Sequence, residues 1–282
     1  MKKFVFTAFL FLAVSTFIHA QEIKIMTYNL RYENDIDGEN NWPNRRDFLL
    51  SQINYYEPEI FGTQEGVASQ LKYMDDNLKD YKYIGIGRDE DTGSGTGEFA
   101  AIFYNIKKFK VLESGTFWLS ENPSKPGKGW DAAQNRICSY GLFQPVKGGK
   151  KFWVFNTHFD HRGDIARIES AKLILKKIKS INKQNYPFVF SGDLNITPDQ
   201  EAVKILSAEL NDSRSVCLTK PFGPVETFNN FKVCEKPEKR IDYIFTSKGN
   251  ITVKKYAVLT EVQDVRYASD HYPVLINIVL SK

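Results

Sequence analysis

Six short stretches of the sequence place polar, chemically capable side chains directly beside runs of apolar residues. They read TYNL, GTQE, NTHFDH, SGDLN, RIDYIF and SDHYP. Their amides and carboxylates form a set of potential oxygen ligands: Asn29, Glu65, Asp193, Asn195, Asp242 and Asp270. Oxygen ligands without cysteine suit hard cations such as Mg²⁺ or Mn²⁺ better than zinc. These residue types therefore predict a divalent-cation site, provided that the fold brings the stretches together.

The histidines fall in the same stretches. The sequence has four, of which His19 lies near the N-terminus and His158, His161 and His271 lie within NTHFDH and SDHYP. Because imidazole changes charge near neutral pH, a histidine beside a carboxylate suits proton transfer. Each stretch alone has an ordinary explanation as a turn or an exposed strand end. The occurrence of all six in one chain favours an active site.

The rest of the chain predicts the elements that must position these side chains. Apolar runs predict strands at 23–30, 59–65, 81–87, 98–105, 109–119, 135–146, 151–159, 186–195, 240–247, 251–260 and 272–280. Helical spacing predicts helices at about 44–57, 67–78, 164–181 and 200–207. Consecutive strands favour antiparallel pairing over a Rossmann-like parallel sheet and imply two packed sheets with helices outside. The strand ends of such a sandwich can meet at one rim, where loops carry functional groups.

The first 20 residues have the layout of a secretory signal peptide. Lys2 and Lys3 precede an apolar stretch from Phe4 to about Phe17, and Ala20 marks the expected cleavage site. The apolar stretch is shorter than the roughly 20 residues of a membrane span, although an uncleaved anchor is the alternative. We therefore expect export to the periplasm or the medium. Residues 21–282 contain no linker or repeat and predict a single domain.

Charge and cysteine content narrow the function classes further. Loss of Lys2 and Lys3 lowers the formal net charge from +4 by two, to +2. A protein held on nucleic acid by charge alone is more basic, but a nuclease with a locally basic groove is still compatible. Cys217 and Cys234 could form a bridge, but free thiols, with Cys138 as a third, are an equal alternative, and the three do not resemble a zinc site.

The ordered set TYNL, TQE, NTHFDH, GDLN, RIDYIF and SDH resembles the endonuclease/exonuclease/phosphatase superfamily, a group of metal-dependent phosphoesterases. The resemblance spans essentially the whole chain after the signal peptide, and GWDAAQNR with NTHFDHRG resembles an exported bacterial branch. It implies an α/β fold, a four-layer sandwich of two mixed, mainly antiparallel sheets packed face to face between helices. It also implies Mg²⁺ or Mn²⁺ as the cofactor.

The same resemblance implies roles for individual residues. Glu65 matches the principal metal ligand, with Asn29 and Asp270 beside it. His271 matches the base that activates water, and Asp270 the residue that aligns it.

Further matches concern the phosphate. Asp193 and Asn195 match the pair that contacts the attacking water and the phosphate, and His158 matches a phosphate-facing histidine. Asp242 matches an active-site aspartate, and Glu98 corresponds to an acidic residue that orients His158. Asn29, Asn195 and His158 would donate hydrogen bonds to the phosphate oxygens.

The substrate must be set by the loops at 31–47, 87–98, 119–136 and 220–239, because the shared fold hosts many functions. Arginines at positions 45, 46, 88, 136, 162 and 240 are candidate phosphate contacts, with Arg88, Arg136 and Arg162 preferred. Trp42, Trp130, Phe228 and Phe231 could stack on bases but are more typical of loop anchors.

Hydrolysis of a phosphoester by water, without a covalent intermediate, is the predicted chemistry. A phosphodiesterase or nuclease is favoured, and a phosphatase or phosphodiesterase acting on a soluble sugar, inositol or lipid headgroup phosphate is the alternative. A binding module on an inactive fold is disfavoured because no motif carboxylate or histidine is missing. The sequence predicts neither membrane insertion nor a protein partner.

Overall fold

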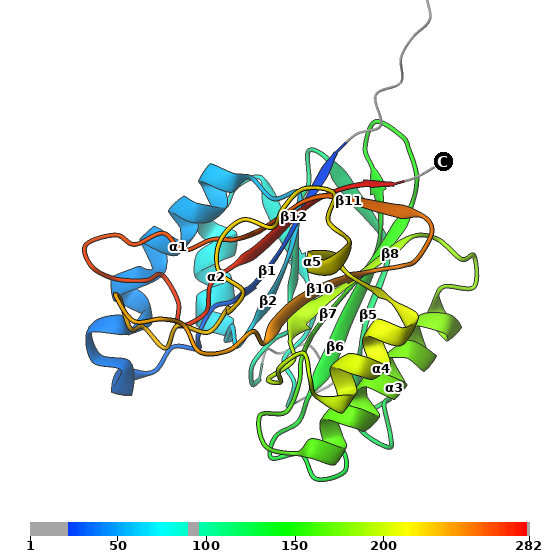
Figure 1. Ribbon diagram of the computed structural model, residues 1–282, viewed down its shortest axis with the longest axis horizontal. Helices are drawn as coiled ribbons and strands as arrows, with labels where there is room; N and C mark the ends of the chain where they lie inside the picture. Colours follow the sequence, from blue (N-terminus) through cyan, green and yellow to red (C-terminus); the bar gives the residue numbers. More distant parts are fainter. Residues whose placement is uncertain (1–21, 90–95, 281–282) are drawn as a thin grey trace, which may run out of the picture.

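The computed structural model describes residues 22–89 and 96–280, so the predicted signal peptide at 1–20 lies outside the described residues. Two six-stranded sheets pack face to face, with α1 and α2 against one outer side and α3 and α4 against the other (Figure 1). This arrangement confirms the predicted sandwich of two sheets between helices. Within the described ranges, no helix combines the length and apolar character needed to span a bilayer.

The first sheet joins strands from both ends of the chain, in the order β11–β12–β1–β2–β4–β3. These strands are β1 (Ile23–Asn29), β2 (Ile60–Gln64), β3 (Tyr81–Ile84), β4 (Ile102–Asn105), β11 (Ile251–Val258) and β12 (Val274–Leu280). β1 and β2 run parallel, and the other neighbours in this sheet are antiparallel.

The second sheet has the order β5–β6–β7–β8–β10–β9. Its strands are β5 (Phe109–Trp118), β6 (Ile137–Pro145), β7 (Phe152–His158), β8 (Phe188–Asp193), β9 (Asn211–Asp212) and β10 (Asp242–Thr246). β7 and β8 run parallel, so each sheet has one parallel pair near its centre. The prediction of mainly antiparallel pairing is therefore confirmed.

Helical crossovers connect the parallel strands, as parallel pairing requires. α1 (Trp42–Tyr56) joins β1 to β2, and α3 (Asp164–Ile181) joins β7 to β8. The other helices are α2 (Ala68–Asn77), α4 (Glu201–Glu209), α5 (Ser213–Val216) and the 3₁₀ helix η1 (Asp35–Asn40). One apolar cluster lies between the two sheets, and two more lie under the helix pairs.

The central strands are buried on both faces, and their alternation decides where each side chain points. In β1, Ile25 packs between the sheets and Met26 packs under α1 and α2. In β7, Val154 packs between the sheets and Phe155 packs under α3 and α4. Both faces are therefore apolar, which explains the continuous hydrophobic runs of these strands in the sequence.

A buried amide network joins the two sheets close to the polar strand ends. Gln64 Nε2 donates to Thr27 Oγ1 at 3.0 Å and to Asn156 Oδ1 at 2.7 Å. Asn156 Nδ2 donates across the interface to the carbonyl oxygens of Thr63 and Ala101 at 2.8 and 3.0 Å. Gly62 makes room for this amide, because a Cβ there would lie 2.4 Å from Asn156 Oδ1. The network therefore ties the sheets together where their strands approach the site.

Three sequence predictions differ from the structure. The first helix begins at Trp42 rather than Asn44, because Asn41 caps it and Pro43 sits in its first turn. The strand expected at 98–105 is reduced to Ile102–Asn105, since Phe99 makes only isolated bridges to neighbouring loops. η1, β9 and α5 are too short to produce a periodic signal.

Candidate active site

The carboxyl ends of the two parallel pairs meet at one rim of the sandwich. Asn29 and Gln64 are paired at the ends of β1 and β2, and Glu65 follows at once. His158 and Asp193 are paired in the same way at the ends of β7 and β8. Successive side chains of a strand point to opposite faces of the sheet. Counted from the residues of each strand that are buried between the sheets, Asn29, His158 and Asp193 also point into that space.

The remaining motif residues lie on or beside strands that pair antiparallel with β8 and β1. Asp242 opens β10 directly opposite Asp193. Asp270 and His271 lie just before β12, which pairs with β1. The predicted convergence of the six stretches is therefore confirmed.

Asn29 links the two sheets by hydrogen bonds to one carboxylate from each. It is fully buried, and its Nδ2 donates to Glu65 Oε1 at 3.1 Å and to Asp193 Oδ2 at 3.0 Å. Its Oδ1, the atom that would bind a cation in the predicted role, accepts instead from the backbone N–H of Arg31 at 2.9 Å. Asn29 thereby sets the distance between Glu65 and Asp193.

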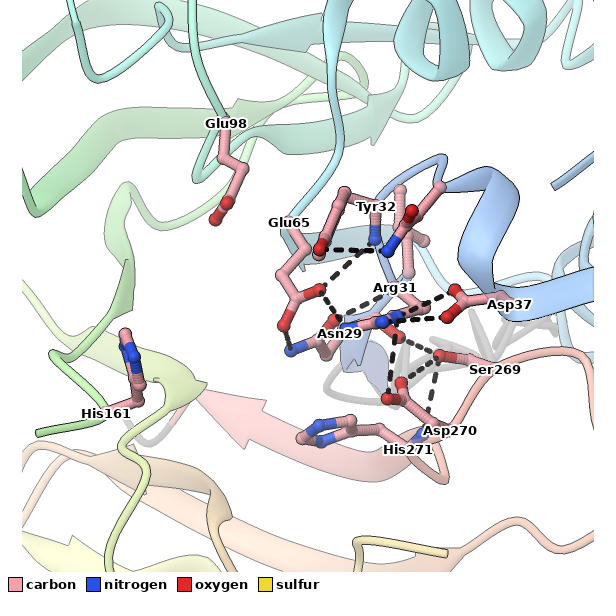
Figure 2. Close-up of polar contacts among 12 residues, drawn as sticks. Asn29, Arg31, Tyr32, Asp37, Glu65, Glu98, His161, Ser269, Asp270 and His271 are labelled. Carbon is pink, nitrogen blue, oxygen red and sulfur yellow. Dashed lines mark hydrogen bonds and ion pairs between the residues drawn. The ribbon is translucent and has the colours of Figure 1, made fainter. Parts of the chain in front are cut away.

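The carboxylate that orients His271 is Asp242, and the prediction that Asp270 aligns it is wrong. His271 Nδ1 lies 2.9 Å from Asp242 Oδ2, which also accepts from Thr227 Oγ1. Asp270 accepts from Ser269 Oγ at 3.4 Å and faces Arg31 at 3.9 Å (Figure 2). Adjacency in the sequence was misleading, because neighbouring side chains leave the backbone in different directions.

His158 meets Asn195 at the other side of the rim. Asn195 Nδ2 lies 2.8 Å from His158 Nε2, and the backbone N–H of Asn195 donates to Asp193 Oδ1 at 2.8 Å. The predicted orienting partner, Glu98, approaches His158 Nδ1 only to 3.7 Å, which is too far for a hydrogen bond. Glu98 instead accepts from Arg88 at 2.7 Å.

Left-handed backbone is concentrated at this rim. Arg31, Glu65 and Asn195 have φ angles of 54°, 62° and 54°. Non-glycine residues adopt this region rarely and at some cost, and they persist where the surroundings hold them. Here the backbone N–H groups of Arg31 and Asn195 donate to side chains of the site, which holds the turns in place.

Crowding of acids alters the electrostatics of the site. Burial, followed by the charge of Asp242, raises the pKa of Asp193 to about 7. Burial raises the pKa of Asp270 to about 6, against the lowering effect of the His271 cation. Burial acts to lower the pKa of His271, but Asp242 and Asp193 outweigh it and hold that pKa well above its ordinary value. Burial thus disfavours the charged forms of Asp193 and Asp270.

The donor set fits a hard divalent cation. Ligand atoms of Glu65, Asp193 and His271 lie within 4.8 Å of one another. Asp270, which is 7% exposed, adds a further carboxylate near Glu65, since Arg31 lies 3.9 Å from both. Buried carboxylates with raised pKa values are a favourable setting for such an ion.

The rim forms a cleft with two connected hollows, of about 380 and 480 Å³. Four residues line both: Arg31, Glu65, His161 and Asn195. Arg31 was missed as a candidate, although it directly follows TYNL in the sequence. Asp37 holds its guanidinium by two hydrogen bonds of 2.8 and 2.9 Å, so Arg31 is a fixed cation between the hollows.

Five of the six candidate arginines separate into three groups, and the sixth, Arg46, stacks over the Tyr73 ring at 4.2 Å. Arg88 and Arg136 line the larger hollow, as expected for substrate contacts. Arg162 is exposed and lines neither hollow, so its predicted phosphate contact finds no support in the geometry. Arg45 and Arg240 are buried and structural: Arg45 donates to backbone carbonyls, and Arg240 pairs with Asp212 at 2.6 Å.

The aromatic candidates also separate. Trp42 is 2% exposed and packs edge-on against Tyr73, so it is an anchor. Phe228 and Phe231 line the smaller hollow, and the Phe228 ring stands edge-on to His271 at 5.1 Å. The three cysteines are free thiols in the described part of the chain, so the bridge between Cys217 and Cys234 is not formed.

Comparison with known proteins agrees with this geometry. Residues 26–271 match the model of the Endonuclease/Exonuclease/phosphatase family. A protein of that family from Bacteroides thetaiotaomicron is 39% identical, with a TM-score of 0.88 over 93% of this chain and 99% of that one. A mannosyl-6-phosphatase from the same organism is 40% identical, with a TM-score of 0.87 over 92% and 100% of the two chains.

More distant similarity extends to longer proteins. Nocturnin from Rattus norvegicus is 25% identical over 280 residues, which cover 89% of this chain and 63% of nocturnin. A mimivirus protein, L388, is 30% identical over 165 residues, which cover 55% of this chain and 59% of that protein. The aligned region thus spans about three fifths of the length of these curated relatives.

Proposed function

The chain belongs to the endonuclease/exonuclease/phosphatase family of phosphoric ester hydrolases, and from this premise we propose that it is a divalent-metal-dependent phosphatase acting on a phosphorylated sugar. The observation that supports this substrate class is the 40% identity to a mannosyl-6-phosphatase, over 92% of this chain and 100% of that one. Two hollows of about 380 and 480 Å³ also suit a small molecule. The proposal revises the preference for a phosphodiester that the sequence alone suggested.

The phosphate would lie between the two parallel strand pairs, above Asn29. The fixed guanidinium of Arg31 supplies donors at this position, and His158 and Asn195, which contact each other at 2.8 Å, border it. Donors that are oriented before the substrate binds stabilise the charge that grows on the non-bridging oxygens in the transition state.

The attacking water would lie between Asp193 and His271. Asp193 Oδ2 and His271 Nε2 are 3.8 Å apart, a separation that one water oxygen can bridge. The bond from His271 Nδ1 to Asp242 holds the ring with Nε2 toward this water. We assign the proton transfer to the pair, rather than to His271 alone, because the pKa values of both groups are raised and one water can contact both.

Glu65, with Asp193 or Asp270, would hold the metal ion, and the oxygen-rich donor set favours Mg²⁺ or Mn²⁺. When bound, such an ion offsets the charge of the phosphoryl group and stabilises the leaving alkoxide. Asn29 keeps Glu65 and Asp193 at the required separation throughout.

A substrate panel tests the proposal. Initial rates would be compared for mannose 6-phosphate, p-nitrophenyl phosphate, bis-p-nitrophenyl phosphate and single-stranded DNA, with EDTA and then with Mg²⁺ or Mn²⁺. We expect turnover of the monoesters, its loss in EDTA and its recovery with metal. Turnover of only the diester and DNA would overturn the phosphatase in favour of a nuclease.

Export is a separate proposal that rests on the N-terminal sequence. The two lysines, the apolar stretch and the small residue at position 20 support cleavage near Ala20 and release to the periplasm or the medium. N-terminal sequencing of the protein recovered from a producing cell tests it. A mature chain that still begins at Met1 would contradict it.

A further inference from the structure

A third histidine, His161, stands in the cleft without a role in the chemistry described above. It lies on the loop after β7 and lines both hollows. Figure 2 shows its ring on the side of the site away from Glu65 and His271. Its ring is therefore placed to contact the part of a substrate that extends beyond the phosphate.

The loop that carries His161 is held by a buried carboxylate. Asp160 is 2% exposed, and its Oδ1 accepts from the backbone N–H groups of Arg162 and Gly163 at 2.9 Å each. Its Oδ2 accepts from the backbone N–H of Gln134 at 3.1 Å, which ties in the neighbouring loop. Burial acts to raise the pKa of Asp160, but these hydrogen bonds and Arg136 hold it well below its ordinary value. The loop thus has a fixed anionic centre.

Arg136 connects this centre to His161. Arg136 is 5% exposed, and its Nε donates to Asp160 Oδ2 at 3.3 Å. One of its terminal nitrogens lies 3.0 Å from His161 Nδ1. A guanidinium can only donate, so Nδ1 must be the acceptor, and the proton of the neutral ring must sit on Nε2. Partial burial and the Arg136 cation both lower the pKa of His161, which keeps the ring neutral.

The hollow beside this pair contains groups that lack partners. The other terminal nitrogen of Arg136, NH1, is buried and has no hydrogen-bond partner within the described residues. Arg136 lines the larger hollow together with Glu98 and Gln134. Donors from Arg136 and His161 thus stand near an acceptor carboxylate. A hydroxyl group can both donate and accept, so adjacent hydroxyls of a sugar match this arrangement.

We propose that His161 is a specificity-determining residue that donates a hydrogen bond from Nε2 to a hydroxyl group of the alcohol portion of the substrate, with Arg136 as its positioning residue. This assignment rests on the proposed sugar-phosphate activity. It excludes His161 as the acid for the leaving group, because a neutral imidazole beside a guanidinium has no readily transferred proton. The contribution of His161 is therefore to binding and orientation of the sugar.

A pair of substrates tests the assignment in the full-length protein. Mannose 6-phosphate offers hydroxyls, whereas p-nitrophenyl phosphate offers none. For His161→Ala we expect kcat/KM to fall about threefold to tenfold with mannose 6-phosphate, the range of one neutral hydrogen bond. The fall should appear mainly in KM. With p-nitrophenyl phosphate the change should stay within about twofold. His161→Gln, which keeps an N–H donor at the end of its side chain, should recover part of the loss.

Equal losses on both substrates, or no loss on either, would overturn the role of His161 in sugar recognition. A purely structural role would reduce both rates together and would not be restored by glutamine.

The tautomer provides a readout that needs neither substrate nor metal. Long-range ¹H–¹⁵N spectra of the ¹⁵N-labelled protein near pH 7 should show the His161 ring neutral with its proton on Nε2. Arg136→Met should abolish this preference while the protein stays folded. A ring protonated on Nδ1, or a cationic ring, would contradict the hydrogen bond from Arg136 to His161 Nδ1. If the wild-type protein leaves mannose 6-phosphate intact, the proposed substrate and the sugar contact fail, and the spectra still decide whether Arg136 positions His161.

Discussion

Replacement of Asp242 by asparagine is the sharpest test of the site. Asp242 is 1% exposed, and its Oδ2 accepts from His271 Nδ1 and from Thr227 Oγ1. Thr227 Oγ1 already accepts from the backbone N–H groups of residues 241 and 242, so its own proton is directed to Asp242. In Asp242→Asn a single amide oxygen must serve both donors, and the negative charge beside His271 is lost.

The size of the effect follows from these contacts. A hydrogen bond to a charged group contributes about 1.5–3 kcal/mol, compared with about 0.5–1.5 kcal/mol for a neutral one. Competition from Thr227 also weakens the orientation of the imidazole, and proton transfer by a positioned group contributes about 10²–10⁴-fold. We therefore expect kcat/KM for p-nitrophenyl phosphate to fall about 10²–10³-fold. The protein should remain folded, because the charge of Asp242 also raises the pKa of Asp193 and its removal relieves that repulsion.

The pH dependence separates this cause from a general loss of structure. The charge of Asp242 raises the pKa values of both His271 and Asp193. Its removal should therefore shift the acidic limb of the kcat/KM profile to lower pH, which initial rates between pH 5 and 9 would detect. Asp270→Asn is the matched comparison, since Asp270 makes no bond to the His271 ring. Asp270 also raises the pKa of His271, but less than Asp242 does, so a larger shift for Asp270→Asn than for Asp242→Asn, with Asp242→Asn within threefold of wild type, would refute the assignment.

Three further predictions concern metal, pH and the support beneath the site. Glu65→Gln should abolish the rise in Tm that Mn²⁺ produces in the wild type and lower kcat at least about 10²-fold, measured by thermal shift and initial rates. In EDTA, Tm should be higher at pH 5.5 than at pH 8: a carboxyl with a raised pKa contributes stability at low pH that is lost as pH rises through the folded-state values of about 6 for Asp270 and about 7 for Asp193. Asn156→Leu should lower the free energy of unfolding by about 2–4 kcal/mol, measured in urea, because it removes a hydrogen-bond partner of the buried Gln64 amide. Asn156→Asp is the comparison variant. A fall of less than about 0.5 kcal/mol in Asn156→Leu would show that the amide network contributes little to stability.

The sequence predicts the position of the site because the information is local. In β1 and β7 each residue facing the other sheet is apolar until the strand nears its end, where Asn29 and His158 take the same orientation. A polar residue that continues an inward-facing apolar series is costly unless it is satisfied, so its presence indicates a function at the rim. Alternation within a strand is readable from sequence, and so is the turn chemistry that follows.

The sequence does not predict in the same way which side chains of different motifs contact each other. Asp242 and His271 are 29 residues apart, and only the antiparallel β8–β10 ladder and the return of the chain into β12 bring them together. Asp270 is the sequence neighbour of His271, yet it turns toward Arg31 and Glu65. The identity of an orienting carboxylate depends on strand register, which motif spacing does not encode.

Arg31 and Arg136 illustrate a second limit. The sequence favours Arg136 as a candidate but not Arg31, and it gives no signal that Arg45 and Arg240 are buried for structural reasons. The difference lies in the hydrogen-bond partners of the guanidinium nitrogens. Both terminal nitrogens of Arg45 donate to backbone carbonyls and both of Arg240 donate to Asp212, whereas one terminal nitrogen of Arg136, which lines the larger hollow, has no partner among the described residues. A donor that is buried without a partner signals a ligand only once the whole hydrogen-bond set is known.

These contacts place the groups that act on the phosphate and the groups that contact the rest of the substrate on different parts of the fold. The acids and histidines stand on the ends of central strands, whose positions are fixed by the core and by the amide network of Gln64 and Asn156. The hollows that receive the rest of the substrate are walled largely by loops, whose backbone is not constrained by either sheet. Loop residues such as His161 can therefore change the alcohol that is recognised without moving the groups that attack the phosphate. Specificity should accordingly respond to substitutions at Arg136 and His161, whereas the pH profile should respond to substitutions at Asp193, Asp242 and His271.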